Sequence, residues 1–155
     1  MSTIVKEKII EIKEKPSDVK RHQEIDKYGR SYATGKRKNA VAKVWIKKGT
    51  GKITVNGLDA IKYFGREILV NMVKAPFISS KNEDKFDVIS NINGGGKSGQ
   101  AGALAHGISK AITLYDPNSH KALRLNGFLT RDPRVVERKK YGYKKARKGQ
   151  TYRKR

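Results

Sequence analysis

The sequence of 155 residues contains no cysteine. Disulfides, thiolate zinc sites and cysteine nucleophiles are therefore all excluded. It also has no apolar run near the roughly 18 residues that a membrane-spanning helix needs. The first residues lack the apolar centre of a signal peptide, and their glutamates (Glu7, Glu11 and Glu14) are atypical of transit peptides. We therefore expect a protein that stays in the compartment of its synthesis and enters no membrane.

Acidic residues are scarce, with 14 Asp and Glu against 36 Lys and Arg, and the formal net charge is +22. Because a charge of this size repels itself, it favours a polyanionic partner. Nucleic acid is the first candidate. An anionic membrane surface is the second, and it is disfavoured because the basic C-terminus has no apolar face to insert.

The positive charge is concentrated at the C-terminus. Residues 131–155 carry 12 Lys and Arg and two acids, and residues 138–155 carry no acid. Tyr141, Tyr143 and Tyr152 lie among these cations. Tyrosine rings stack on bases, and cations contact phosphates. A solvated tail is the plainer interpretation of a charge run, but the missing acids and the interleaved rings favour an RNA-binding segment that is extended when bound.

Three regions follow from the pattern of charge and hydrophobicity. Residues 1–29 form a leader that we expect to be weakly ordered. Residues 30–130 predict a globular α+β domain, and residues 131–155 predict an extended basic tail. The middle region alone has enough regularly spaced apolar residues to form a core.

Within the domain, alternating apolar residues predict strands. Ala42, Val44 and Ile46 would share one face of a strand over residues 40–46. A glycine-containing turn predicts that residues 53–55 return as the second strand of a hairpin. The Asn56-Gly57 pair predicts a further turn, and residues 86–92 read as another strand.

Helices are expected over residues 59–64 and 67–75, with Pro76 ending the second. Apolar residues at helical spacing then predict a long amphipathic helix between Ala101 and Tyr115. Asp116-Pro117 provides a cap and first position for one more helix, which Gly127 closes.

The glycine-rich segment over residues 93–100 raises the alternative of a nucleotide-binding enzyme. The phosphate-loop pattern fails because its first glycine would fall on Asn91. The dinucleotide pattern G-x-G-x-x-G matches at Gly94, Gly96 and Gly99, but a helix start, not a second parallel strand, follows at Asp116. We therefore expect the glycines to permit positive φ and close packing of a helix on the sheet, or to face an RNA phosphate.

Catalytic groups are otherwise lacking. The three histidines, His22, His106 and His120, are scattered, and His106 beside an apolar stripe is better explained by packing or surface exposure than by catalysis. No carboxylate pair, metal triad or nucleophile–base set is evident. The sequence predicts no enzyme, no cofactor and no metal.

Three sequence blocks resemble one family. YATGKRKNAVAKVWIKKGTGKITVNG (32–57), GGGKSGQAGALAHGISKAI (94–112) and GFLTRDPRVVERKKYGYKKAR (127–147) are similar to the ninth protein of the small ribosomal subunit, in its bacterial form. The resemblance covers about residues 30–155 and leaves out the leader. It implies a structural constituent of the small subunit, with the cytoplasm of a bacterium or an organelle as its setting.

The same resemblance implies a fold and partners. The fold would be a four-stranded sheet backed by helices, like the second domain of ribosomal protein S-five, with a left-handed βαβ crossover that departs from the usual hand. The partners would be rRNA in the small-subunit head, neighbouring head proteins and the peptidyl-site tRNA.

Residues for these contacts follow by position. We expect rRNA phosphates to be bound by a set of cations and one tyrosine: Lys36, Arg37, Lys38, Arg131, Arg134, Arg138, Lys139, Lys140, Tyr141, Lys144, Lys145, Arg147 and Lys148. The resemblance implies tRNA contact by Arg153, Lys154 and Arg155. Family members of the bacterial type usually end Phe-Ser-Lys-Arg, so Tyr152 keeps the aromatic ring and Arg153 replaces the serine. A free-standing nucleic-acid binder or RNA chaperone is the alternative, which shares the charge but not the three blocks.

Overall fold

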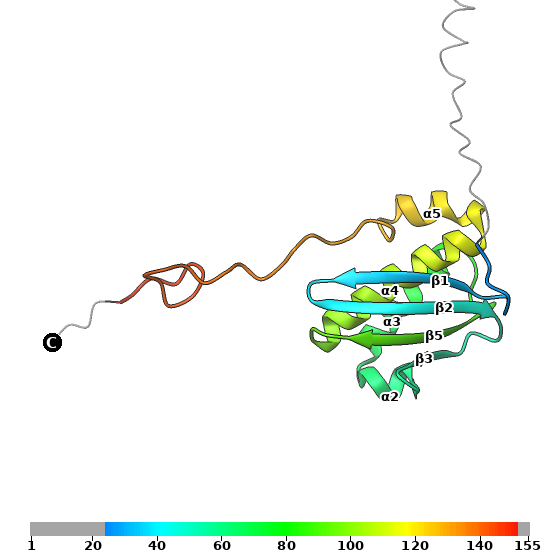
Figure 1. The fold of residues 1–155 in the computed structure, drawn as a ribbon, viewed down its shortest axis with the longest axis horizontal. Coiled ribbons are helices and arrows are strands. Elements are labelled where there is room, and N and C mark those ends of the chain that lie inside the picture. Colours follow the sequence, from blue (N-terminus) through cyan, green and yellow to red (C-terminus); the bar gives the residue numbers. More distant parts are fainter. Residues whose placement is uncertain (1–23, 152–155) are drawn as a thin grey trace, which may run out of the picture.

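The computed structural model describes residues 24–151. A mixed sheet of five strands in the order β1-β2-β5-β3-β4 forms one layer, and helices cover one of its faces (Figure 1). The strands are β1 (Ser31–Arg37), β2 (Ala40–Lys48), β3 (Ile53–Val55), β4 (Leu58–Asp59) and β5 (Phe86–Asn93). The helices are α2 (Ala60–Phe64), α3 (Glu67–Ser79), α4 (Lys97–Tyr115), the 3₁₀ turn η1 (Pro117–Ser119) and α5 (His120–Leu125). The predicted α+β class is confirmed.

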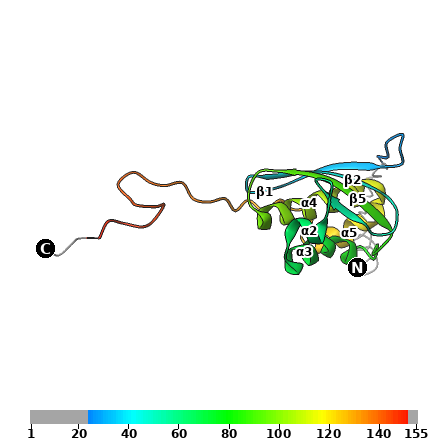
Figure 2. The same ribbon diagram turned by 90° about the horizontal axis from the view of Figure 1, so that it is seen from below.

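The two longest strands behave as their alternation predicted. In β2 the side chains of Ala42, Val44 and Ile46 are fully buried. β5 pairs antiparallel with β2 and buries Val88 and Ile92 on the same face. These residues meet α4, whose Leu104, Ile108 and Ile112 are also fully buried. Figure 2 shows the resulting two layers, with the sheet above the helices.

β1 was not predicted. It pairs antiparallel with β2, and its inward positions hold small residues, Ser31, Ala33 and Gly35. Their size reflects the close approach of α4. A Cβ on Gly35 would overlap the carbonyl oxygen of Ala103 and the amide of Gly107. The strand therefore lacks the bulky alternation that identifies strands in a sequence.

The predicted hairpin between residues 40–46 and 53–55 is wrong. β3 does form, but β5 lies between it and β2, and β3 pairs with β5 in parallel. The chain between β3 and β5 carries α2 and α3, so this is a βαβ crossover. The turn after β2 is short enough for a hairpin. Nothing in its sequence showed that β2 would instead pair with β5, more than thirty residues further along the chain.

The strand number also differs from the expected four. The fifth strand is the two-residue β4, which follows β3 through the predicted Asn56-Gly57 turn. Both turn residues have positive φ, 49° and 80°, the combination that a tight primed hairpin turn requires.

Pro76 does not end α3. The helix continues to Ser79 with Pro76 inside it. Pro76 lacks an amide hydrogen and so removes one helical hydrogen bond. Continuing the helix buries Phe77, whose ring lies 6.5 Å from that of Phe86, and this burial offsets the lost bond.

Candidate nucleic-acid interface

The tail begins at a well-formed helix end. α5 closes at Gly127, whose amide donates to the carbonyl of Arg124 while the amide of Phe128 donates to that of Leu123. This pair of bonds is a Schellman motif. Leu123 is fully buried and Phe128 packs against the core. The predicted closure at Gly127 is confirmed, and the chain after Phe128 leaves from a fixed point.

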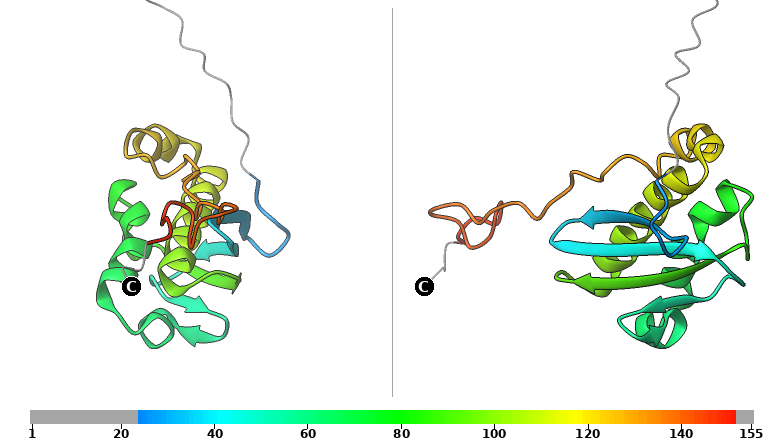
Figure 3. Two further views of the ribbon diagram at one scale, coloured as in Figure 1. Left: turned by 90° about the vertical axis from the view of Figure 1, so that its left-hand side faces the viewer. Right: turned by 45° about the vertical axis from the view of Figure 1, so that its right-hand side comes forward.

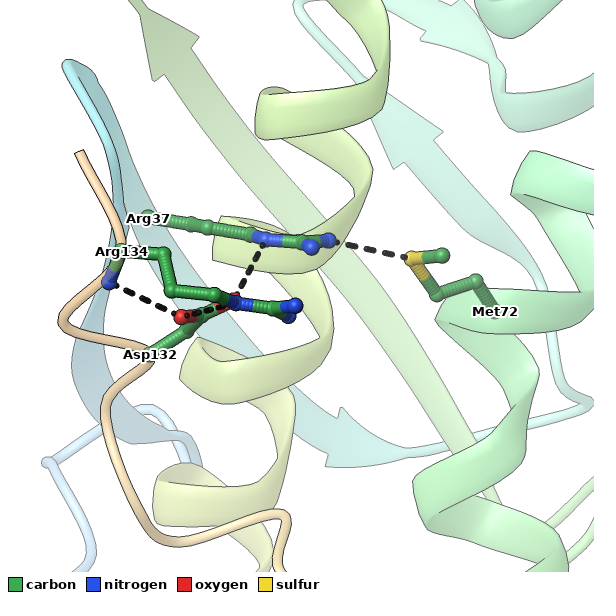
Figure 4. Close-up of polar contacts among 4 residues, drawn as sticks. All are labelled: Arg37, Met72, Asp132 and Arg134. Carbon is green, nitrogen blue, oxygen red and sulfur yellow. Dashed lines mark hydrogen bonds and ion pairs between the residues drawn. The ribbon is translucent and has the colours of Figure 1, made fainter. Parts of the chain in front are cut away.

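Asp132 fixes the next segment to the domain (Figure 4). Its carboxylate accepts hydrogen bonds from the backbone and guanidinium of Arg134, the latter at 2.8 Å from Nη2. It also forms an ion pair with Arg37 at 3.4 Å. The hydrogen bonds from the Arg134 side chain and backbone hold the pKa of Asp132 far below its usual range. Asp132 therefore joins strand β1 to the root of the tail as a carboxylate.

Arg37 is partly committed to this joint. Its side chain is only 24% exposed, lies over Gly102 of α4 and directs Nη1 toward the sulfur of Met72 at 3.8 Å. An arginine held this way has less freedom to reach a phosphate. Arg37 remains a predicted rRNA ligand, while its neighbours Lys36 and Lys38 are exposed.

His106 lies at the same joint. Its Nδ1 accepts a hydrogen bond from the amide of Lys36 at 3.3 Å. Burial, and then the charge of Lys110, lowers the pKa of His106. Packing of the neutral ring between β1 and the tail root agrees with a structural interpretation of this histidine.

The second acid of the tail, Glu137, draws the chain into a loop. It accepts a hydrogen bond from Arg147 at 2.7 Å and pairs with Lys140 at 3.0 Å. The amide of Lys144 donates to the carbonyl of Lys148 within the same loop. The bonds from Arg147 and then Lys140 lower the pKa of Glu137. Figure 1 shows this loop at the end of an irregular, extended connection that runs away from the domain.

The remaining tail cations are not paired in this way. Within residues 24–151, no ion pair joins an acid to any of six tail cations: Arg131, Arg138, Lys139, Lys144, Lys145 and Lys148. All are exposed, and so is the ring of Tyr141. Arg134, Lys140 and Arg147 each share an acid instead. The structure thus divides the predicted tail cations into six that are exposed and unpaired and three that each bind a tail acid.

The glycine-rich segment serves the fold. Gly94 has a φ of +75°, and a Cβ there would overlap the carbonyl of Asn39. Lys97 Nζ donates to the carbonyl of Tyr63 at 2.9 Å and lies over its ring. Gln100 accepts a bond from the Tyr63 hydroxyl at 3.0 Å. The lysine of the motif is thus bound to α2, and the expected role in positive φ and close packing is confirmed.

Features of other site classes are lacking in the part of the chain that the structure describes. No strand follows β5 there, so a dinucleotide fold is excluded. No three His, Asp or Glu residues of residues 24–151 gather as a metal site. Among these residues, no helix combines the length and apolarity that crossing a membrane requires.

The tRNA-facing residues predicted from the chain end, Arg153, Lys154 and Arg155, lie outside the described residues, as do Tyr152 and most of the leader. Sequence reasoning missed the two acids, Asp132 and Glu137. Their isolation among cations was a usable signal, because a lone carboxylate in a basic segment attracts the nearest arginine.

One comparison with known proteins bears on this interface. The family model for ribosomal protein S9/S16 matches residues 35–155. The match starts within β1 and extends over the whole tail, so it includes the Arg37–Asp132 joint and the unpaired cations.

Proposed function

The chain belongs to the ribosomal protein S9/S16 family, and from this membership we propose that its tail anchors it to rRNA of the small-subunit head. As a member of that family it is a structural, rRNA-binding component of the ribosome and not an enzyme. Its setting is the ribosome of the cytoplasm or of an organelle, and we infer the bacterial type from the sequence blocks. The observation that carries the proposal is the family match over a tail whose cations are mostly unpaired.

Phosphate neutralisation supplies the affinity. Each phosphate contact adds roughly 0.7–0.9 to the slope of log K against log salt. The six unpaired tail cations, with Lys36 and Lys38, would give a slope of about −6 to −7. Arg37, Arg134, Lys140 and Arg147 can add to it where phosphates displace the carboxylates. Tyr141, fully exposed, is placed to stack on a base or sugar.

The domain over residues 30–130 supplies position. We infer that it docks in the head beside neighbouring proteins and resembles the second domain of ribosomal protein S-five, including the left-handed crossover between β3 and β5. The leader over residues 1–29 has no assigned role. Asp132 and the Schellman motif at the end of α5 set the direction in which the tail leaves the domain, because both hold its first residues against the domain.

The tail end is proposed to contact the peptidyl-site tRNA. Arg153, Lys154 and Arg155 would make charge-assisted hydrogen bonds to its phosphates, which position a tRNA without reading sequence. Arg153, in place of the usual serine, adds a third cation to this set.

Deletion of residues 153–155 tests the proposal. We expect subunits to assemble as before and peptidyl or initiator tRNA to dissociate faster from them. Restoring serine with Arg153→Ser should retain slow dissociation. Unchanged tRNA off-rates in the deletion would refute the tRNA contact.

Sedimentation separates the alternative of a free-standing nucleic-acid binder. A tagged full-length chain should travel with small subunits through a washing step in high salt. Recovery of the chain only in free RNA fractions would support the alternative.

A further inference from the structure

The sheet has a second face that no helix of the described residues covers. Figure 3 shows β1, β2 and β5 in front of α4, with no helix over their outer side. The segment before β1 borders this side at one end, where Glu24, Asp26 and Arg30 line a pocket with Tyr32. Along one row of this face the register places Tyr32 beside Trp45 and Trp45 beside Ile89. The row continues through Thr54 to Asp59 at the edge.

The centre of this face is apolar and accessible. Tyr32 is 43% exposed and Ile89 45% exposed, and Trp45 is partly exposed. The Tyr32 and Trp45 rings lie 5.2 Å apart between centroids, with an interplanar angle of 39°. Contiguous exposed apolar side chains of this kind mark an interaction surface.

Cations flank the aromatic pair. Lys43 and Lys47 occupy the outward positions on either side of Trp45 in β2, about 7 Å along the strand from it, and Lys36 follows in β1. All three are exposed. Asn91 and Asn93 of β5 add amides that can both donate to and accept from base edges.

Two acids of this face accept hydrogen bonds from backbone amides. Asp87 accepts from the amides of Thr50 at 2.8 Å and Lys52 at 3.1 Å. Asp59 accepts from the amide of Ile61 at 3.2 Å as the cap of α2. Among the described residues, no ion pair joins either carboxylate to Lys36, Lys43 or Lys47. Asp87 also lies opposite Lys47 in the register, and the charge of Lys47 contributes to its lowered pKa. Asp26, which lines a pocket with Tyr32, is paired with Arg30. The positive charge that no acid of this face offsets therefore comes from Lys43 and Lys36.

We propose that this open face is a second RNA-binding surface, on which an unpaired base of a single-stranded rRNA segment stacks against the Tyr32–Trp45 pair while Lys43 and Lys47 contact its flanking phosphates. Aromatic residues on the face of a β-sheet stack on splayed-out bases in this way. A paired helix presents no free base face, so the surface selects loops, bulges or strand ends. The inference adds a site to the rRNA binding proposed for the tail and does not depend on the tail contacts.

The chain carries its own probe for this site. Trp45 is its single tryptophan, so tryptophan fluorescence of the full chain reports on the open face alone. The titration uses single-stranded oligo(U) of about ten nucleotides, within the range of sites that aromatic platforms occupy. Anisotropy of a dye on the RNA reports total binding, including binding by the tail. Inorganic polyphosphate serves as the unstacked polyanion.

We expect oligo(U) to quench Trp45 at saturation and polyphosphate to leave its emission unchanged. Anisotropy that saturates while Trp45 emission stays constant would overturn the open-face site and leave the tail proposal intact. That outcome is also the one expected if a neighbouring protein covers the face. Loss of both signals would instead count against RNA binding as a whole.

Matched variants locate the contact. Tyr32→Val should shift the midpoint of Trp45 quenching about tenfold, the scale of one stacked base. Leu125→Ala removes an exposed apolar side chain, 81% exposed, from α5 and should leave the midpoint of Trp45 quenching unchanged. Lys43→Gln with Lys47→Gln keeps the aromatic pair and should weaken quenching as well, which guards against a folding defect in Tyr32→Val. Equal midpoints in wild type, Tyr32→Val and the double lysine variant would refute the proposal.

Discussion

The domain and the tail use their few acids for different purposes. In the domain, Asp59, Asp87 and Asp116 accept hydrogen bonds from backbone amides at turns and helix starts. In the tail, Asp132 and Glu137 bind arginine and lysine side chains. The domain has a buried core that sets its shape, so its acids complete local structure. The tail has no such core, so its acids set where its cations point.

The difference separates two properties of the chain: the domain core sets its shape, and the tail holds the densest positive charge. Replacing surface cations of the domain should leave its fold intact, because the fold depends on the buried core. Replacing apolar side chains of the tail should leave its positive charge intact. Substitutions of the same type should therefore have different consequences in the two regions.

The largest effect is expected from five unpaired tail cations. Changing Arg138, Lys139, Lys144, Lys145 and Lys148 to Gln should reduce the salt slope of RNA binding by about 3.5–4.5. The thermal unfolding temperature should not change, because these side chains are exposed and pack on no core. Anisotropy titrations at several salt concentrations measure the slope.

A matched domain variant provides the control. Lys48, Lys62, Lys74, Lys81 and Lys121 are exposed and distributed over the domain. Their joint change to Gln removes the same charge and should alter the slope much less. Equal losses of slope in the two variants would mean that net charge, and not the tail, determines binding.

The next effect concerns stability. Gly35→Ala forces a methyl group against the backbone of α4 at Ala103 and Gly107. Overpacking of this kind costs about 1–3 kcal/mol of unfolding free energy. Gly149→Ala makes the same change in the tail, where nothing lies nearby, and should leave stability unchanged. Urea unfolding followed by Trp45 fluorescence measures both, and an unaffected Gly35→Ala would contradict the close strand–helix contact.

Gly35 also shows where sequence reasoning stopped. Periodicity identified β2, β5 and α4, because each presents apolar residues at a regular spacing. Glycine, proline and capping signals located α2, α3 and the last helix. β1 was not predicted because close packing on α4 requires small residues. Ser31, Ala33 and Gly35 therefore form no pattern of alternating bulky apolar side chains. The pairing of β3 with β5 was not predicted because strand pairing over long sequence separations depends on the whole sheet.

The site was predictable to a similar degree. Charge and tyrosine content located the tail, and the sequence blocks identified its family. The sequence alone could not divide the cations, because pairing depends on which side chains the two tail acids reach. Arg37 and Asp132 are separated by almost a hundred residues, so only the folded chain brings them together.

Two aspartates test the different uses of acids directly. Asp116→Ala removes the cap that accepts from the Asn118 amide and the Ser119 hydroxyl, which should cost about 1 kcal/mol of stability. Asp132→Ala should leave stability nearly unchanged. It releases Arg134 and loosens Arg37, and one added phosphate contact would steepen the salt slope by about 0.7–0.9.

Unfolding curves and salt titrations of both aspartate variants give the comparison. Trypsin should also cleave faster after Arg131 in Asp132→Ala, because the tail root is no longer tied to β1. A slope that stays constant in Asp132→Ala would show that Arg134 does not reach RNA when it is released.

The smallest effect lies at the joint between the two regions. His106 has a lowered pKa because of burial and then the nearby charge of Lys110, with Arg131 of the tail adding to the same direction. The pKa of this histidine in the unfolded chain is taken as the ordinary value of 6.5. As pH falls through this value, the unfolded chain takes up the proton first, so the stability contributed by neutral His106 is present above pH 6.5 and declines toward the lowered pKa. The free energy of unfolding should therefore fall as the pH drops below 6.5, and His106→Gln should flatten the change.

Variants of the tail determine whether the two regions are coupled through this histidine. Arg131→Gln removes a charge at the joint, so the pKa of His106, followed by NMR titration of its ring protons, should rise toward 6.5. Lys148→Gln removes the same charge in the outer loop of the tail and should leave that pKa unchanged. If both variants shift His106 equally, the tail acts on the domain only through its net charge. If only Arg131→Gln shifts the pKa of His106, the charges at the tail root act on the domain and the charges of the outer tail do not.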